Sequence, residues 1–361
     1  MEKNIIRDRG AVYCNEGAWD ALQEIISEIK PTKVFVLTDE HTQVDCLPYF
    51  LEHFHTAHIP IQLTIPAGEI YKTIATCLEL WKQLSENGAD RKSLLINLGG
   101  GVVTDLGGFV ACTYQRGIDF INVPTSLLAM VDASVGGKNG VDLGALKNQI
   151  GIIHNPRAVI VDTQFLETLP PEQFKSGMSE MIKHGFIHSE TYLQQAMAMS
   201  QSHTDETSQL IWDSILIKNS IITEDPLEQG LRKTLNYGHT LGHAIESYCL
   251  ETPSKDSLLH GEAIAIGMIL ATYISHEQFS FPKEKLEETS AFLLKTFRKV
   301  DFSKPEIDEI IKLLIFDKKN TSGKIQFVLL ENIGIHRLNC IVPNELIYDA
   351  FNFYGKLDKE A

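Results

Sequence analysis

In the first half of the chain, short apolar and β-branched runs alternate with stretches that have the spacing of amphipathic helices. This alternation predicts a mainly parallel sheet with helices on both faces, because parallel strands need a long crossover between them. Gly88 follows the second helical stretch, where glycine typically ends a helix. The expected strands are Val34–Asp39, Ile61–Ile65, Leu94–Leu98, Phe120–Pro124 and Val159–Asp162, and the expected helices are about Ala21–Ile29, Ile74–Ser85 and Val103–Tyr114.

The pattern changes at Leu169–Pro171, after which helical patterns dominate. We expect two domains: residues 1–170, an α/β Rossmann-like nucleotide-binding domain, and residues 171–361, a mainly α-helical domain. Ligands of parallel sheets bind at the carboxyl ends of the strands, so we expect the active site in the cleft between the domains. The expected helices are about Pro171–His188, Glu190–Gln201, Glu206–Thr223, Arg232–Tyr248, Gly261–Ser275, Lys283–Phe297 and Pro305–Phe316, followed by one late strand, Lys324–Leu330.

Charge and composition exclude several classes of protein. The 361 residues include 32 Lys and Arg against 47 Asp and Glu, a formal net charge of −15, which argues against nucleic acid or an anionic membrane as partner. The first residues lack the apolar core of a signal peptide, and no run approaches the roughly 18 apolar residues of a membrane span. The six cysteines form no CxxC pair, as is typical of reduced thiols. We expect a soluble cytoplasmic protein.

Three consecutive glycines, Gly99–Gly101, follow an apolar run and precede a helical stretch. Such a turn lets the backbone approach a pyrophosphate, and the helix N-terminus supplies free N–H groups. Thr104 takes the place of the third glycine of G-x-G-x-x-G, and a tight turn without a nucleotide is the alternative. Polar residues at the ends of neighbouring strands favour the nucleotide: Asp39, Glu69, Lys72, Thr125 and Ser126.

A second glycine-rich stretch, Asp132–Asn139, contains Lys138 and is followed by Lys147 and Asn148. It lacks the spacing of a P-loop, but a lysine beside paired glycines suits a phosphate or carboxylate. An exposed lysine loop is the alternative. Arg116 adds another cation to this part of the chain.

Five polar residues, Arg232, Asn236, His239, His243 and Glu246, recur at spacings of four, three, four and three. These spacings place them on one face of the expected helix. Imidazoles and an amide are unusual on a face that serves only solubility, although a solvated face is the alternative. His239 and His243, four residues apart, are spaced to bind one metal ion.

Other residues extend this set. Glu180 and Lys183 lie three residues apart on a predicted helix, and His260 begins another. A surface ion pair and a packing histidine are the alternatives, but together with His239 and His243 these residues suggest a His/His/carboxylate zinc site. Lys218 shares a helix face with isoleucines, so we expect it to have an anionic partner, because burying a lone ammonium costs several kcal/mol. Snorkelling to the rim is the alternative.

Several long motifs resemble, in order, those of 3-dehydroquinate synthases: Gly99–Asp105, VPTSLLAMVDASVGGK, KNQIG, GMSEMIKHG, RKTLNYGHTLGHAIE, HGE and DKKN. The resemblance extends from about Asp39 to Leu330. It implies a cytoplasmic, homodimeric shikimate-pathway enzyme that uses NAD+ and a zinc or cobalt ion. The implied reaction turns 3-deoxy-D-arabino-heptulosonate 7-phosphate into 3-dehydroquinate and phosphate, by transient oxidation, phosphate elimination, re-reduction and intramolecular aldol closure.

The resemblance also implies a role for each matching residue. The implied metal ligands are Glu180, His239 and His260, although spacing alone favours His239 with His243. The implied NAD contacts are Asp39, Glu69, Lys72, Gly100, Gly101, Asp105, Thr125, Ser126 and Lys147. The implied substrate contacts are Asp132, Lys138, Asn148, Lys183, Lys218, Arg232, Asn236 and His243, of which the catalytic set is His243, Lys218, Arg232, Asn236 and Lys183. Arg116 resembles an arginine that reaches the neighbouring subunit's site, and either Lys318 or Lys319 is expected to close the phosphate end.

Three other functions fit parts of this pattern. A metal-dependent polyol dehydrogenase has a similar two-domain plan but needs fewer cations than Lys138, Lys183, Lys218 and Arg232 supply. A related sugar phosphate cyclase of secondary metabolism is expected to alter the residues that bind the carboxylate. A non-catalytic metal- or nucleotide-binding relative is expected to lack at least one of these residues.

Overall fold

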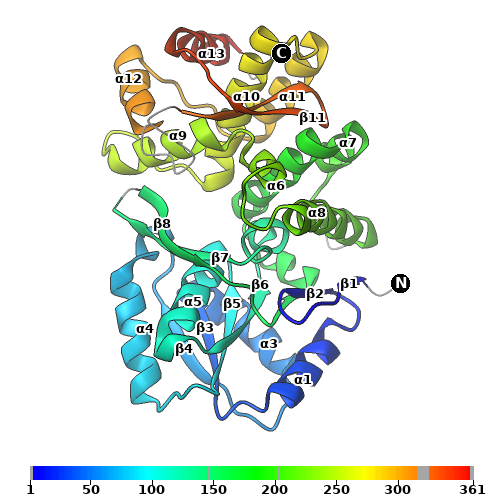
Figure 1. The fold of residues 1–361 in the computed structure, drawn as a ribbon, viewed down its shortest axis with the longest axis vertical. Coiled ribbons are helices and arrows are strands. Elements are labelled where there is room, and N and C mark those ends of the chain that lie inside the picture. Colours follow the sequence, from blue (N-terminus) through cyan, green and yellow to red (C-terminus); the bar gives the residue numbers. More distant parts are fainter. Residues whose placement is uncertain (1–2, 145, 202–203, 315–324, 358–361) are drawn as a thin grey trace. The chain divides into compact units, whose positions relative to one another are not determined.

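The computed structural model describes residues 3–144, 146–201, 204–314 and 325–357. These residues form two compact units: unit 1 is Met1–Phe174 with Ser200–Asn219, and unit 2 is Lys175–Met199 with Ser220–Ala361. Figure 1 shows the ribbon with its helices and strands labelled. The division into domains at residue 170 stays a prediction.

Unit 1 is built around a seven-stranded sheet with the order β1-β2-β9-β6-β5-β3-β4. Every pairing in it is parallel except that between β1 and β2 at one edge. The predicted α/β class is therefore confirmed. The strands are β1 (Lys3–Ile5), β2 (Ala11–Cys14), β3 (Val34–Asp39), β4 (Ile61–Ile65), β5 (Leu94–Gly99), β6 (Asp119–Pro124) and β9 (Ala158–Val161).

The central strands are apolar because both of their faces are covered. All six residues of β5 and the first five of β3 are buried, as expected for interior parallel strands. Phe35, Leu37 and Leu95 pack with Val103 and Leu106 in one continuous core. The helices of unit 1 are α1 (Ala18–Ile29), α2 (Glu40–Asp45), α3 (Leu47–His53), α4 (Ile74–Glu86) and α5 (Gly101–Thr113), and short turns form η1 (Glu69–Tyr71), η2 (Tyr114–Arg116), η3 (Ala129–Ala133) and η4 (Thr163–Glu167).

The glycine-rich stretch after Asp132 ends η3 and forms a turn up to Gly137, and from Lys138 the chain forms an antiparallel hairpin that the sequence pattern did not predict, β7 (Lys138–Leu143) with β8 (Leu146–Ile153). The hairpin packs on α5 (Figure 1). Gly108 of α5 allows this packing, because a side chain there would meet the Asn139 carboxamide. Strands β1 and β2 and helices α2 and α3 are further elements that the sequence pattern did not predict.

Unit 2 is mainly helical, as predicted. Helix α10 (His260–Phe279) is apolar on nearly all sides because α9, α11, α13 and β10 pack around it. The other elements are α6 (Pro171–His188), α7 (Glu190–Ala198), η5 (Leu231–Asn236), α9 (His239–Glu251), α11 (Lys283–Thr296), α12 (Lys304–Leu313), β10 (Phe327–Asn332), β11 (Ile335–Cys340) and α13 (Asn344–Lys356). Helix α8 (Asp205–Glu224) begins in unit 1.

Two predictions for this unit are wrong. The single late strand at Lys324–Leu330 is an antiparallel pair, β10 and β11. The single helix Arg232–Tyr248 is a 3₁₀ segment, η5, followed by α9, with a break at Gly238. Gly238 has φ 75°, and a side chain there would meet Met268 of α10, so tertiary packing fixes a conformation that favours glycine. None of the helices among the described residues has the length and apolar character that crossing a membrane requires.

Glu306 is expected to make the stability of unit 2 depend on pH. Its carboxylate accepts hydrogen bonds from the Ser303 amide and hydroxyl, both at 2.7 Å, and lies 2.9 Å from Lys255 Nζ. Burial alone would raise the pKa of Glu306, but Lys255 and Ser303 lower it from 4.5 to about 2. A folded-state pKa below the unfolded value means that the stabilisation is present above pH 4.5 and is lost as the pH falls towards 2.

We therefore expect Glu306→Gln to lower the urea midpoint of unfolding at pH 7 and to differ progressively less from the wild type as the pH falls below 4.5. Glu309→Gln, on the same helix but 56% exposed beside Lys312, is the matched control and should change the midpoint little at either pH. A Glu306→Gln effect of equal size at pH 7 and pH 3 would contradict this assignment.

Candidate active site

The three glycines lie where β5 meets α5. Gly99 ends β5, Gly100 precedes the helix and Gly101 is its first residue. A side chain on Gly99 would collide with Val103, and one on Gly100 would meet the Ser126 hydroxyl. The amide of Thr125 donates to the carbonyl of Gly99 at 3.0 Å. The structure thus brings together, at the carboxyl ends of β5 and β6, four residues implied to contact NAD: Gly100, Gly101, Thr125 and Ser126.

Asp39, at the end of β3, caps a helix in this structure. Its carboxylate accepts hydrogen bonds from the amides of His41 at 3.0 Å and Thr42 at 2.8 Å, and so begins α2. Asp39 itself ends β3, one of the strand ends where the sequence predicts nucleotide contacts. The capping role fixes the position of this carboxylate.

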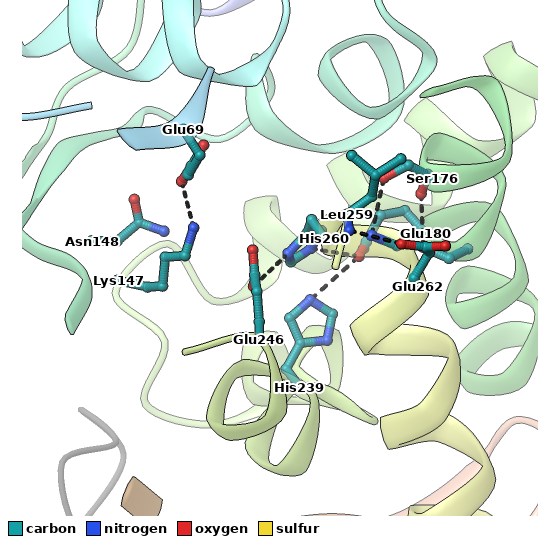
Figure 2. Close-up of polar contacts among 12 residues, drawn as sticks. Glu69, Lys147, Asn148, Ser176, Glu180, His239, Glu246, Leu259, His260 and Glu262 are labelled. Atoms are coloured by element: carbon teal, nitrogen blue, oxygen red, sulfur yellow. Dashed lines mark hydrogen bonds and ion pairs between the residues drawn. The ribbon is translucent and has the colours of Figure 1, made fainter. Parts of the chain in front are cut away.

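Four other residues implied to contact NAD lie in one ion-pair network. Lys72 is buried, and its Nζ lies 2.7 Å from Asp105 Oδ2, 2.6 Å from Asn148 Oδ1 and 3.9 Å from Glu69 Oε1. Glu69 Oε1 also pairs with Lys147 Nζ at 2.9 Å (Figure 2). Burial by itself lowers the pKa of Lys72, but the carboxylates of Asp105 and Glu69 raise it above its ordinary value. The network ties η1 and α5 to β8, and it joins the implied substrate residue Asn148 to the implied cofactor residues.

The anionic partner predicted for Lys218 is confirmed. Lys218 is 6% exposed, and its Nζ lies 2.7 Å from Asp132 Oδ1 and also donates to the Asp132 carbonyl. Both residues belong to unit 1. Neighbouring Ile211 and Ile215 are buried, so the ammonium emerges from an apolar helix face directly onto a carboxylate.

Lys138 and Arg116 are the exposed cations among the candidates in unit 1. Lys138 begins β7. Arg116 lies in η2, before the amino end of β6, and has φ 71° next to Gln115 with φ 49°. Arg116 therefore lies near the amino ends of the parallel strands, whereas Thr125 follows the carboxyl end of β6. The structure does not bring Arg116 to the other candidate residues of this unit.

In unit 2, three donor atoms from three helices converge. Glu180 lies on α6 and is fully buried, His239 begins α9 and His260 begins α10. Glu180 Oε1 lies 3.4 Å from His239 Nε2 and 3.3 Å from His260 Nε2 (Figure 2). Two ligands at about 2.0–2.1 Å from a tetrahedral zinc ion lie about 3.3–3.4 Å apart. The donor set and its spacing therefore fit a divalent cation.

The second nitrogen of each imidazole faces an oxygen. His239 Nδ1 lies 3.0 Å from the Tyr237 carbonyl, and His260 Nδ1 lies 3.3 Å from Glu246 Oε2. A proton on Nδ1 satisfies both contacts and leaves the Nε2 lone pair of each ring directed at Glu180, as in metal-binding histidines. Although burial alone would lower it, Glu246 and Glu180 raise the pKa of His260 to about 10, so a cation bound at Nε2 displaces a proton.

Glu180 also pairs with Lys183, one turn along α6. Burial alone would raise the pKa of Glu180, but Lys183 and His239 hold it well below its usual range. The carboxylate is therefore ionised and competent to bind a cation. The surface ion pair considered from the sequence is excluded, because both side chains are buried.

Local contacts fix His260 beside Glu180. The Gly261 amide donates to Ser176 Oγ on α6 at 2.9 Å, and a side chain on Gly261 would collide with the Ser176 backbone. Glu262 Oε2 accepts from the Leu259 amide at 2.9 Å, which closes the first turn of α10 (Figure 2). The start of α10 is thus held against the helix that carries Glu180.

The remaining candidates of unit 2 lie on η5 and α9. Arg232 is 2% exposed and donates from Nη1 to the Pro226 carbonyl at 2.8 Å, and Asn236 Nδ2 donates to Glu228 Oε1 at 2.7 Å. The His243 ring centroid lies 5.1 Å from that of His239 and 5.7 Å from that of His260. The three imidazoles therefore form one cluster.

Two residues of these networks received no role from the sequence. Glu246 was noted only as part of the polar face, although its place seven residues after His239 on one helix was a usable signal. Asp142, whose Oδ1 accepts from the Asn148 amide at 2.6 Å, lies in a hairpin that the sequence pattern did not predict. Lys318 and Lys319, proposed for the phosphate end, lie outside the described residues.

Two family models match most of the chain: "3-dehydroquinate synthase N-terminal" over residues 62–176 and "3-dehydroquinate synthase C-terminal" over residues 177–320. A 3-dehydroquinate synthase of Parabacteroides distasonis is 40% identical over 92% of this chain and 94% of its own length. One of Sulfurovum sp. is 38% identical over 95% of each chain.

Solved structures agree with these matches. A 2-deoxy-scyllo-inosose synthase complexed with carbaglucose-6-phosphate, NAD+ and Co2+ is 28% identical, with a TM-score of 0.83 over 97% of this chain and 99% of its own. A 2-epi-5-epi-valiolone synthase from Streptomyces hygroscopicus with NAD+ and Zn2+ bound is 21% identical and shares the fold, with a TM-score of 0.81 over 98% of this chain and 99% of its own. The chain belongs to the 3-dehydroquinate synthase family.

Proposed function

We propose that this protein converts 3-deoxy-D-arabino-heptulosonate 7-phosphate into 3-dehydroquinate and phosphate, as a phosphorus–oxygen lyase of the shikimate pathway. The observation that carries the proposal is the convergence of Glu180, His239 and His260. In both histidines the other ring nitrogen, Nδ1, faces an oxygen atom. The support for the proposal is the family membership together with relatives of nearly equal length that are named for this reaction.

The proposed cation ligands are Glu180, His239 and His260, for zinc or cobalt, the ions of the two solved relatives. The proposed NAD+ contacts are Asp39, Glu69, Lys72, Gly100, Gly101, Asp105, Thr125, Ser126 and Lys147. When bound, the cation polarises substrate hydroxyls and the nicotinamide supplies a transient oxidation that is later reversed. No net oxidation results, so the cofactor is regenerated in each turnover.

The chain's own residues hold the two anionic ends of the substrate. Lys183 and Arg232 of unit 2, with Lys138 and Asn148 of unit 1, are proposed for this role, and the other proposed substrate contacts are Asn236 of unit 2 with Asp132 and Lys218 of unit 1. Lysine and arginine stabilise carboxylate and phosphate through charge-assisted hydrogen bonds. Asp132 holds Lys218 in position, and Lys72 holds Asn148 in position, before substrate binds. Less side-chain conformational entropy is then lost on binding.

His243 is the proposed proton shuttle, because an imidazole titrates near neutral pH and this ring lies beside both histidine ligands. We expect His243→Gln to lower kcat by roughly 10²–10⁴-fold while the bound zinc per chain stays at the wild-type level. Steady-state rates and elemental analysis of the dialysed variant test this. Loss of zinc would instead make His243 a cation ligand, as its spacing from His239 alone suggests.

We further propose that the chain acts as a cytoplasmic homodimer in which Arg116 reaches the site of a second copy. The exposed position of Arg116 near the amino ends of the strands, away from the carboxyl ends where the other candidates of its unit lie, supports this. Light scattering after size exclusion should give twice the mass of one chain. In a mixture of Arg116→Ala and His243→Gln chains, hybrid dimers should recover activity that neither variant has alone, and absence of recovery would remove this role for Arg116.

The reaction itself is tested with purified protein, the heptulosonate 7-phosphate, catalytic NAD+ and zinc. We expect stoichiometric phosphate and 3-dehydroquinate, identified by mass, without accumulation of NADH, and loss of turnover on addition of a chelator. Intact heptulosonate together with NADH formation from a simple polyol would identify a dehydrogenase. Turnover of another sugar phosphate instead would identify a related cyclase.

A further inference from the structure

Glu246 is a buried carboxylate that contacts His260, one of the proposed cation ligands. It is 7% exposed and projects from α9 on the same face as His239, two turns earlier. Its Oε2 lies 3.3 Å from His260 Nδ1, while Nε2 of the same ring lies 3.3 Å from Glu180 Oε1 (Figure 2). His260 is thus held between two carboxylates, one at each ring nitrogen.

The contact selects one form of the imidazole. An ionised carboxylate only accepts hydrogen bonds, so the nitrogen that faces Glu246 carries a proton. The neutral ring then has its lone pair on Nε2, the nitrogen that faces Glu180. The contact also fixes the rotation of the imidazole about its Cβ–Cγ bond, because a rotated ring would no longer direct Nδ1 at Glu246.

The two histidines of the site are held differently. His239 faces a backbone carbonyl, that of Tyr237, and its side chain is 9% exposed. His260 faces a charged side chain, and its own side chain is 25% exposed. The less enclosed ring therefore faces a carboxylate, at 3.3 Å, whereas the more enclosed ring faces a neutral carbonyl, at 3.0 Å.

We propose that Glu246 is a positioning residue: it sets the tautomer and orientation of His260 and so strengthens the binding of a divalent cation by Glu180, His239 and His260. The proposal rests on the cation site of the proposed function. It assigns no contact between Glu246 and the substrate.

The test measures cation binding rather than turnover. Zinc affinity is measured by competition with a chromophoric chelator, and Co2+ binding is followed through its visible absorption bands, which report ligand geometry. We expect Glu246→Gln to weaken zinc binding by roughly 10–100-fold, the range for loss of a partner behind a metal ligand, and to alter the Co2+ bands. Glu251→Gln is the matched control, because it makes the same charge change on the same helix at an exposed position.

The outcomes separate this inference from the proposed function. Wild-type protein that binds neither zinc nor Co2+ overturns both. Wild-type binding that Glu246→Gln leaves unchanged, in affinity and in Co2+ bands, overturns only the role of Glu246. If circular dichroism shows that Glu246→Gln does not fold, Glu246→Asp replaces it: the charge is kept but the carboxylate is withdrawn by one methylene. Weaker binding by Glu246→Asp supports the direct contact, and wild-type affinity contradicts it.

Discussion

Replacing Glu180 by glutamine is expected to remove the bound cation and to lower turnover by roughly 10³-fold or more, because a cation's stabilisation of transition-state charge is worth several kcal/mol. Glu180 supplies the carboxylate oxygen on which both histidine nitrogens converge. A carboxamide has nearly the same shape but carries no charge and is a poor zinc ligand. The loss should therefore appear as loss of zinc from the purified protein.

The same substitution has a second effect, on folding. Lys183, which is 1% exposed, would lose the carboxylate with which it pairs on α6. Removing one partner of a buried ion pair typically costs about 3–5 kcal/mol, because the other charge stays buried. We therefore expect Glu180→Gln to be less stable in urea as well as depleted of zinc.

A double variant separates the two effects. Glu180→Gln with Lys183→Met removes both charges of the pair, so stability in urea should recover substantially while zinc stays absent. Zinc content by elemental analysis, turnover and the urea midpoint are measured for both variants. Full zinc content and turnover in folded Glu180→Gln would contradict the cation site itself.

The sequence predicted the fold best where strands are buried on both faces. The predicted runs Val34–Asp39 and Leu94–Leu98 lie in the observed interior strands β3 and β5, because interior parallel strands are continuously apolar and bounded by turns. The hairpin β7–β8 was missed because its strands are rich in polar residues and glycine. Its formation depends on packing against Gly108 of α5, which no local pattern records.

The helix Arg232–Tyr248 shows the limit of periodicity. Its polar spacing continues through Gly238, yet the helix is interrupted there, because Gly238 has φ 75° and Met268 of α10 occupies the space that a side chain would need. Spacing also favoured His239 with His243, since periodicity detects neighbours on one helix only. Glu180 and His260 come from other helices, so the residues alone left His243 and His260 as alternative ligands, and the family resemblance implied His260.

Three glycines explain how α9 and α10 approach closely enough to bring His239 near His260. A Cβ atom on Gly267 of α10 would lie 2.0 Å from the carbonyl oxygen of Gly238 and 2.8 Å from the amide nitrogen of Gly242. These two atoms form the first hydrogen bond of α9, at 3.0 Å. Both belong to the backbone, so no rotation of a side chain relieves the overlap.

We therefore expect Gly267→Ala to destabilise the protein by about 1–3 kcal/mol or more, the range for overpacking, and to weaken zinc binding, because separating the helices moves His239 away from His260. Helix propensity alone predicts the opposite, a gain of about 1 kcal/mol when alanine replaces glycine inside a helix. Gly355→Ala in α13 isolates that effect, since among the described residues nothing lies within 4 Å of an added Cβ there, and it should be neutral or stabilising. Urea unfolding and chelator competition measure both quantities. A Gly267→Ala protein that behaves like Gly355→Ala would show that the close approach of α9 and α10 does not hold the two histidines together.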